Sequence, residues 1–335
     1  MTTHRKPRRF AALTVAATSL GVMPLVGGGE AITAPPPRAG AAVAIAANPR
    51  ASAEHRYRIN AKIRLGLFSL RRDDVGSALM TSRSTGEATA FALLAGSDPN
   101  RVPGNLNRWA YVREEVRDDS AEVFSVRSDD AVPDAHARGG DAMPFNAGCT
   151  SVTTHDVHSS MTTVDAPDAT YRRFDRLLER LEATPAKWNG RYIARPPGME
   201  PGFLSAMHNL LSGHDVEAVK THGAVTYVFN NKLYDLAVKR VRSLGRTTVG
   251  SRTFEQLTQV DLMVRSRTSG DVTRFAVTTV LDGSEGSLPV QIFFQPSFWI
   301  VVELRVDDQV DVPRDPADDG SLLTRMRGIC ASVTR

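Results

Sequence analysis

The chain has 335 residues, and its 41 Lys and Arg against 37 Asp and Glu give a formal net charge of +4. Residues 1–50 carry six of the basic residues and one of the acidic ones, which leaves 35 and 36, or a net charge of about −1, for the rest. A near-neutral body argues against a protein that binds nucleic acid through a basic surface.

The first residues have the layout of a secretory signal peptide. A basic cluster at residues 5–9 precedes an apolar run, Phe10–Val26, and small residues suited to cleavage follow. We expect a signal peptide and tether over residues 1–46, with an uncleaved N-terminal anchor as the alternative. No later run is long enough for a membrane-spanning helix, so we expect a secreted or periplasmic protein without a transmembrane segment after cleavage.

Period-two alternation predicts strands in the first half of the chain. Residues 56–70 alternate between apolar and mostly basic side chains, which predicts one strand with a buried face and a solvated face. Further strands are expected at 75–82, 87–94, 108–117, 121–126 and 151–164, with a long surface loop over 129–148.

Two helices are expected within a helical insert, residues 166–213. Apolar residues recur at helical spacing over 171–181, where Asp165 or Asp168 is placed to cap the start. The second helix covers about 201–212 and is expected to end at Gly213.

Residues 224–306 show the clearest β pattern of the chain, an antiparallel meander. Val260, Leu262 and Val264 share one face, and turns at 269–270 and 282–283 separate the strands that follow. We expect a β-rich domain over 51–306, either single or divided into subdomains 51–165 and 220–306. Residues 307–335 are expected to be an acidic linker followed by a short C-terminal helix.

The two cysteines, Cys149 and Cys330, would lie in an oxidising compartment, where a pair favours a disulfide. The bridge would close a loop of about 180 residues and stabilise the fold by about 5 kcal/mol in the chain-entropy model. Two unlinked buried thiols are the alternative.

These patterns predict a mainly β fold with minor α content: a curved antiparallel sheet or half-barrel, two helices laid across its open face, and a short C-terminal helix. Short motifs of the chain resemble exported bacterial β-rich proteins catalogued only as a domain of unknown function. The matching segments are 203–206, 231–234, 288–292 and 302–304, with departures at Met207, where the family has an aromatic residue, and at Asn231, where it has Gly. The resemblance implies a curved sheet or open barrel in the cell envelope, and no activity.

Histidines supply the candidate catalytic residues. His155, Asp156 and His158 form the densest cluster, and on a strand Asp156 and His158 share a face. His208 is a further candidate, but no spacing matches a known metal motif, so we expect no metal and no cofactor. Surface or structural histidines are the alternative.

Aromatic residues supply the candidate ligand-binding residues: Trp109, Tyr227, Phe298 and Trp299. Both faces at the start of the last strand are apolar, so helices or a bound lipid must cover them. We expect a secreted or periplasmic, non-enzymatic protein that binds a lipid or other apolar or amphipathic envelope ligand, or acts as an interaction module. The alternative is a secreted hydrolase or metal-dependent enzyme that uses Asp156 and His158 with other histidines.

Overall fold

The computed structural model describes residues 52–65, 68–98, 100–102, 108–128, 144–184, 187–212, 219, 223–281, 288–297 and 300–334. Within these residues, fourteen strands form one antiparallel sheet in the order β8-β7-β6-β5-β4-β3-β2-β1-β14-β13-β12-β11-β10-β9. The sheet is not closed, because β8 and β9 are its two edges. The expected mainly β class is confirmed, whereas the expected signal peptide lies outside the described residues.

The strands are β1 (Ser52–Leu65), β2 (Phe68–Ser84), β3 (Thr89–Ser97), β4 (Trp109–Val116), β5 (Ala121–Ser128), β6 (Pro144–Val152), β7 (Asp156–Asp165), β8 (Asn189–Ala194), β9 (Ala224–Phe229), β10 (Lys232–Val249), β11 (Arg252–Ser266), β12 (Val272–Thr279), β13 (Gln291–Ser297) and β14 (Ile300–Val306). The helices are α1 (Phe174–Glu182), α2 (Phe203–Leu211), the short 3₁₀ helix η3 (Pro316–Asp318) and α4 (Gly320–Val333).

The first strand joins the two halves of the sheet. Tyr57 lies opposite Ala78 of β2 on one side and opposite Val306 of β14 on the other. The N-terminal strands and the C-terminal meander are therefore parts of one continuous sheet.

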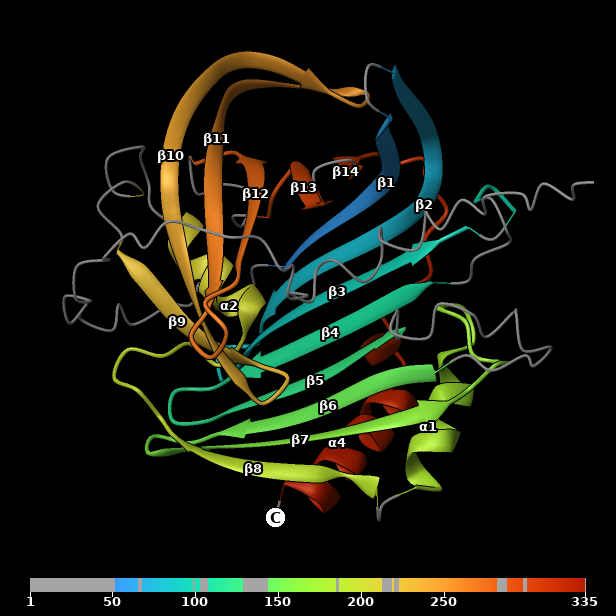
Figure 1. Cartoon of the computed structure of the whole chain (residues 1–335), viewed down its shortest axis with the longest axis vertical. Coiled ribbons are helices and arrows are strands. Elements are labelled where there is room, and N and C mark those ends of the chain that lie inside the picture. Colours follow the sequence, from blue (N-terminus) through green and yellow to red (C-terminus); the bar gives the residue numbers. More distant parts are fainter. Residues whose placement is uncertain are drawn as a thin grey trace, which may run out of the picture.

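The sheet curls on itself (Figure 1), and β-bulges contribute to the bending. In β10 the register shifts between Val238 and Arg240 and again around Gly245, where the long β10–β11 hairpin arches over the molecule. In β1 a shift follows Ile59, and the buried Asn60 side chain accepts a hydrogen bond from the backbone N–H of Asp74 at 2.9 Å.

The two faces of the curled sheet carry separate cores. We call the face that contacts α2 the inner face and the face that contacts α1 and α4 the outer face. Alternation along β3 shows the division: Phe91, Leu93 and Ala95 join the inner core, whereas Ala92 and Leu94 join the outer one. Both sets of side chains are buried, so the sheet has helices on both sides.

Several expectations about elements are wrong in detail. The two helices do not share one open face, because α1 lies on the outer face and α2 on the inner face. The expected strand 56–70 contains the break between β1 and β2, and 151–164 contains the turn between β6 and β7. Strand β6 begins at Pro144, inside the expected loop 129–148.

The start of α1 also differs from the expectation. Neither Asp165 nor Asp168 caps it: the N-cap residue is Arg173, without a side-chain cap, and the Thr170 hydroxyl accepts from the backbone N–H of Arg172 and Arg173. The expected stop of α2 at Gly213 lies outside the described residues.

The C-terminal region is fastened to the outer face. The disulfide between Cys149 of β6 and Cys330 of α4 is present, with a Cα–Cα distance of 5.2 Å, which confirms the expected pair. The segment expected as a linker is packed: the buried Asp315 carboxylate accepts hydrogen bonds from Tyr111 Oη at 2.8 Å and from Thr81 Oγ1 at 3.2 Å. Among the described residues, no helix is long and apolar enough to cross a membrane.

Candidate functional site

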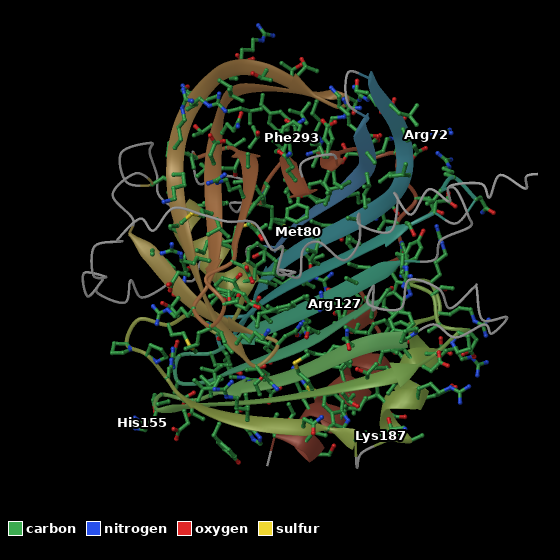
Figure 2. The ribbon with its side chains drawn as sticks, viewed as in Figure 1. Arg72, Met80, Arg127, His155, Lys187 and Phe293 are labelled. Atoms are coloured by element: carbon green, nitrogen blue, oxygen red, sulfur yellow. A yellow bond between two sulfur atoms is a disulfide. The ribbon has the colours of Figure 1, made fainter. Side chains whose placement is uncertain are left out.

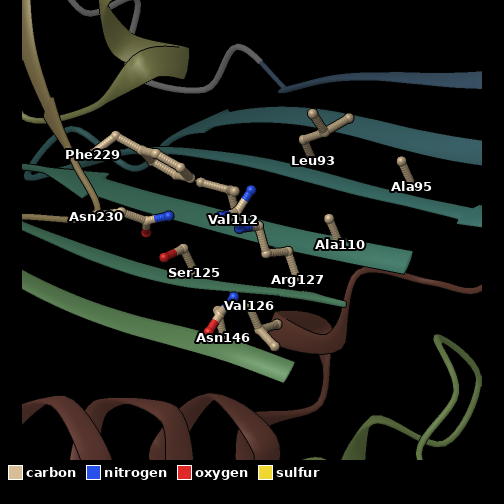
Figure 3. Close-up of a pocket in the computed structure, with 10 residues that line it drawn as sticks. All are labelled: Leu93, Ala95, Ala110, Val112, Ser125, Val126, Arg127, Asn146, Phe229 and Asn230. Atoms are coloured by element: carbon tan, nitrogen blue, oxygen red, sulfur yellow. The ribbon is translucent and has the colours of Figure 1, made fainter. Parts of the chain in front are cut away.

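A small cavity of about 20 Å³, partly open to solvent, lies on the inner face over β3 to β6. Figure 3 shows its floor, with the β9–β10 turn along one side. The apolar part of the lining comes from alternate residues of two strands, Leu93 and Ala95 of β3 with Ala110 and Val112 of β4, and from Phe229 of β9. The two alanines lower the floor, because their side chains do not fill the space that a larger residue would.

The remaining lining comes from Val126 and from polar residues that include one cation. Ser125 and Arg127 of β5, Asn146 of β6 and Asn230 of the turn complete the wall. In Figure 3 the Arg127 side chain runs along the floor toward the β9–β10 turn. Burial raises the pKa of Tyr234 in β10, and the positive charge of Arg127 opposes this shift. A half-buried guanidinium beside an apolar floor suits a ligand with an anionic group and an apolar body.

The same strand that lines the cavity also anchors α2. Two residues beyond Val112, the fully buried Glu114 carboxylate accepts hydrogen bonds from the backbone N–H groups of Leu204 at 2.7 Å and Ser205 at 2.8 Å. These are N–H groups of the first turn, which have no partner inside a helix. A carboxylate there is also favoured by the helix dipole. Glu114 therefore fixes α2 to β4.

The turn before α2 is shaped around this carboxylate. A Cβ on Gly202 would lie 2.3 Å from Glu114 Oε1, so only glycine leaves room for the carboxylate. Ser205 Oγ accepts from the backbone N–H of Gly202 at 3.2 Å and donates to its carbonyl at 3.1 Å. The backbone N–H of Glu200 donates to Thr226 O at 2.8 Å, so the segment before α2 pairs with the edge strand β9.

The expected catalytic residues do not converge. His155 and Asp156 are exposed at the β6–β7 turn, whereas His158 is buried and stacks on Tyr192 with ring centroids 4.0 Å apart. His158 alternates with Val157, and Ser160, on the same face as His158, donates to Val333 O of α4 at 2.7 Å, which places this pair on the outer face. His208 of α2 lies on the inner face against Phe91, so the sheet separates it from His158.

His208 lines a second, smaller cavity of about 10 Å³ with Met80, Phe91 and Leu288 among its neighbours. Burial lowers its pKa, which favours the neutral imidazole. Among the described residues, no group of three or more His, Cys, Asp or Glu side chains is placed to hold a metal ion.

Two of the expected ligand-binding aromatics, Trp109 and Tyr227, lie in different cores. Trp109 is fully buried in the outer core, with ring centroids 4.9 Å from Phe145 and 5.8 Å from Phe174. Tyr227 is buried in the inner core beside Tyr234 and Phe203. Phe298 and Trp299 lie outside the described residues.

The residues that line the inner-face cavity are not among the residues expected from the sequence, because the expected ligand-binding residues are large aromatic side chains. One signal was available: Ser125 and Arg127 alternate with Phe124 and Val126, which marks β5 as a strand with an apolar face and a polar face. Which of its polar residues face a cavity depends on the β9–β10 turn, about 100 residues further along the chain.

The fold and the cavity define a β protein with a curled open sheet, a helix fixed on its inner face and a small, partly open cavity on the same face. Comparisons with family models, with curated proteins and with solved structures gave no match to this chain. The resemblance of its short motifs to an exported β-rich family stays a prediction.

Proposed function

We propose that this protein is an exported, non-enzymatic binding protein that holds a small amphipathic anion in the inner-face cavity. The observation that carries the proposal is the pairing of an apolar floor with the half-buried cation Arg127 in one cavity that is partly open to solvent. The enclosed part of this cavity is only about 20 Å³, room for about one water molecule, so a bound anion would lie over the cavity and stay partly exposed to solvent. The apolar chain would lie over Ala95 and Ala110, and the anionic group would lie beside Arg127.

Two further features support the proposal. The disulfide between Cys149 and Cys330 belongs to proteins of oxidising compartments, in agreement with export. The histidines that a hydrolase would use lie on opposite faces of the sheet, and no Ser–His hydrogen bond forms between Ser160 and His158, because the serine hydroxyl donates to Val333 O.

Isothermal titration with dodecanoate below its micellar concentration tests the proposal, with dodecyltrimethylammonium as a probe of the same chain length and opposite charge. We expect saturable binding of dodecanoate that weakens about tenfold in Arg127→Gln. Arg117→Gln is the matched control, because it removes a cation that pairs with Glu115 on the outer face.

Ala110→Phe tests the floor, because a phenyl ring would occupy the space that the alanine leaves open. We expect this variant to lose binding of dodecanoate while its melting temperature stays close to that of the wild type. Absence of dodecanoate binding, equal affinities of Arg127→Gln and Arg117→Gln, or tighter binding of the cationic probe would overturn the proposal.

A further inference from the structure

The two edge strands of the sheet differ in whether another segment covers them. Strand β9 is covered, since the segment before α2 pairs with it at Glu200 and Tyr227 and α2 packs on it. Strand β8 pairs with β7 on one side, and within the described residues no strand pairs with its other side. Uncovered edge strands expose backbone groups that can pair with another chain.

The hydrogen-bond register shows which backbone groups of β8 face outward. The N–H of Arg195 donates to His155 O of the β7 side at 3.0 Å, and Ala194 lies opposite Asp156. Because hydrogen-bonded and non-hydrogen-bonded pairs alternate in an antiparallel ladder, the backbone N–H and C=O groups of Arg191 and Ile193 also point toward β7. The N–H and C=O groups of Gly190, Tyr192 and Ala194 therefore point away from the sheet.

Most residues along this edge are exposed, and its charged side chains are all cationic. Residues 187–195 include Lys187, Arg191 and Arg195 and no Asp or Glu. Figure 2 places Lys187 near one end of this edge and His155 near the other. Two copies of the chain would bring two such cationic strands together, which disfavours self-pairing and favours an acidic partner.

Tyr192 is an exposed residue of this edge whose ring is already held in one orientation. Its side chain is 69% exposed, yet its ring is held by stacking on His158, and a Cβ on Gly190 would lie only 2.8 Å from His158 Nε2. A tyrosine that is exposed but already ordered loses little side-chain entropy on binding, and tyrosine is enriched among the residues that dominate interfaces.

We propose that the outer edge of β8 is a docking site for an extended, acidic segment of a partner protein, which adds to the sheet as a further strand beside Tyr192. Backbone hydrogen bonds to Gly190, Tyr192 and Ala194 supply affinity, and carboxylates of the partner pair with Lys187 and Arg191. The site is at the opposite end of the sheet order from the covered edge β9, and no residue of β8 lines the inner-face cavity.

Fluorescence anisotropy with two labelled synthetic peptides tests the proposal, one with alternating Glu and Val and one with alternating Lys and Val. We expect the wild type to bind the glutamate peptide at least about tenfold more tightly than the lysine peptide. Arg191→Glu reduces that preference, because it replaces a cation of the edge by an anion.

Ala194→Pro tests the backbone pairing. Proline removes an N–H that faces solvent and leaves the bonds to β7 in place, so the fold is retained. We expect about tenfold weaker binding of the glutamate peptide, whereas the matched control Ala194→Ser, which keeps the N–H, binds like the wild type.

Hydrogen exchange gives an independent readout. On binding of the glutamate peptide, the amides of Tyr192 and Ala194 become protected, whereas those of Arg191 and Ile193 are protected beforehand by β7. Equal binding of the two peptides, equal affinity of Ala194→Pro and Ala194→Ser, or concentration-dependent dimerisation through this edge would overturn the proposal.

Discussion

Two neighbouring residues of β4 show how strongly the face of a strand decides the state of a side chain. Glu114 points to the inner face, where burial raises its pKa more than hydrogen bonds from Leu204 and Ser205 lower it. Glu115 points to the outer face, where burial again opposes the charge, but Arg327, Arg113 and Arg117 more than offset it and lower the pKa. The contributions of these two carboxyl groups to stability therefore change with pH in opposite directions.

The sign of each contribution follows from linkage. The folded state holds the proton of Glu114 more tightly than the unfolded state does, so its contribution to stability is full below the ordinary pKa of 4.5 and is lost as the pH rises through the folded pKa. The contribution of Glu115 is full above 4.5 and is lost as the pH falls through its lowered pKa.

We therefore expect Glu114→Gln and Glu115→Gln to have opposite pH profiles. The unfolding free energy of the wild type minus that of Glu114→Gln should decrease as the pH rises above 4.5, by at most about 1.4 kcal/mol per pH unit. The same difference for Glu115→Gln should increase as the pH rises toward 4.5. Urea denaturation at a series of pH values measures both, and parallel profiles would contradict the assignment.

Glycine is required at position 202 because of the neighbouring Glu114 and not because of the backbone conformation. The φ of Gly202, −158°, is extended and open to any residue. We expect Gly202→Ala to lower the unfolding free energy by about 1–3 kcal/mol, because the added Cβ would overlap the Glu114 carboxylate. In combination with Glu114→Ala, the cost of the alanine should fall by more than about 0.5 kcal/mol.

Gly223→Ala is the matched control, because a Cβ at that position meets no atom within 4 Å. Chemical denaturation measures all four variants. Additive effects of Gly202→Ala and Glu114→Ala would show that the contact between these two residues does not constrain α2.

At the scale of elements, the C-terminal segment is held by contacts of three kinds. Its apolar residues Met326 and Ile329 join the outer core, Arg327 pairs with Glu115, and Cys330 is bonded to Cys149. Arg325 adds a bidentate pair with Glu182 at the end of α1, at 2.7 and 2.8 Å. The disulfide is the covalent member of this set, so it limits how far α4 can leave the sheet.

Removal of the disulfide should loosen α4 before the rest of the fold. We expect the double variant Cys149→Ala, Cys330→Ala to lose about 2–5 kcal/mol of unfolding free energy. Limited trypsin digestion of the folded variant should cut first at Arg325 and Arg327. Dithiothreitol should reproduce the effect in the wild type and have no effect on the variant, and unchanged stability would contradict the role of the bridge.

At the scale of the molecule, one sheet joins what the sequence presents as two subdomains. Strand β1 pairs with both halves, and the inner core mixes residues of β2 and β3 with residues of β9 to β14 and of α2. A fold whose halves share a strand and a core is expected to unfold cooperatively.

Leu210→Ala tests that cooperativity, because Leu210 of α2 is fully buried in the inner core. We expect a loss of about 2–5 kcal/mol, with a single transition by calorimetry. Hydrogen exchange governed by global unfolding should accelerate equally in β4–β6 and in β10–β12. Faster exchange in β10–β12 alone would show that the chain behaves as two subdomains.

Much of the fold could be read from alternation within short segments. The faces of Val260, Leu262 and Val264, the turn at Ser269-Gly270 and the C-terminal helix are as expected, because neighbours in sequence decide them. The paired cysteines could be predicted from composition and the expected compartment, although their proximity could not.

Only the tertiary structure decided which buried side chains lie on the inner face of the sheet and which lie on the outer face. Alternation shows that a strand has two faces, but the inner face is defined by the curl of a sheet in which residues 57–63 of β1 pair with residues 300–306 of β14. For this reason the two helices lie on opposite sides, His158 and His208 are separated, and Arg127 lies beside the β9–β10 turn. A local pattern fixes the period of a segment, whereas long-range packing places its side chains in a common site.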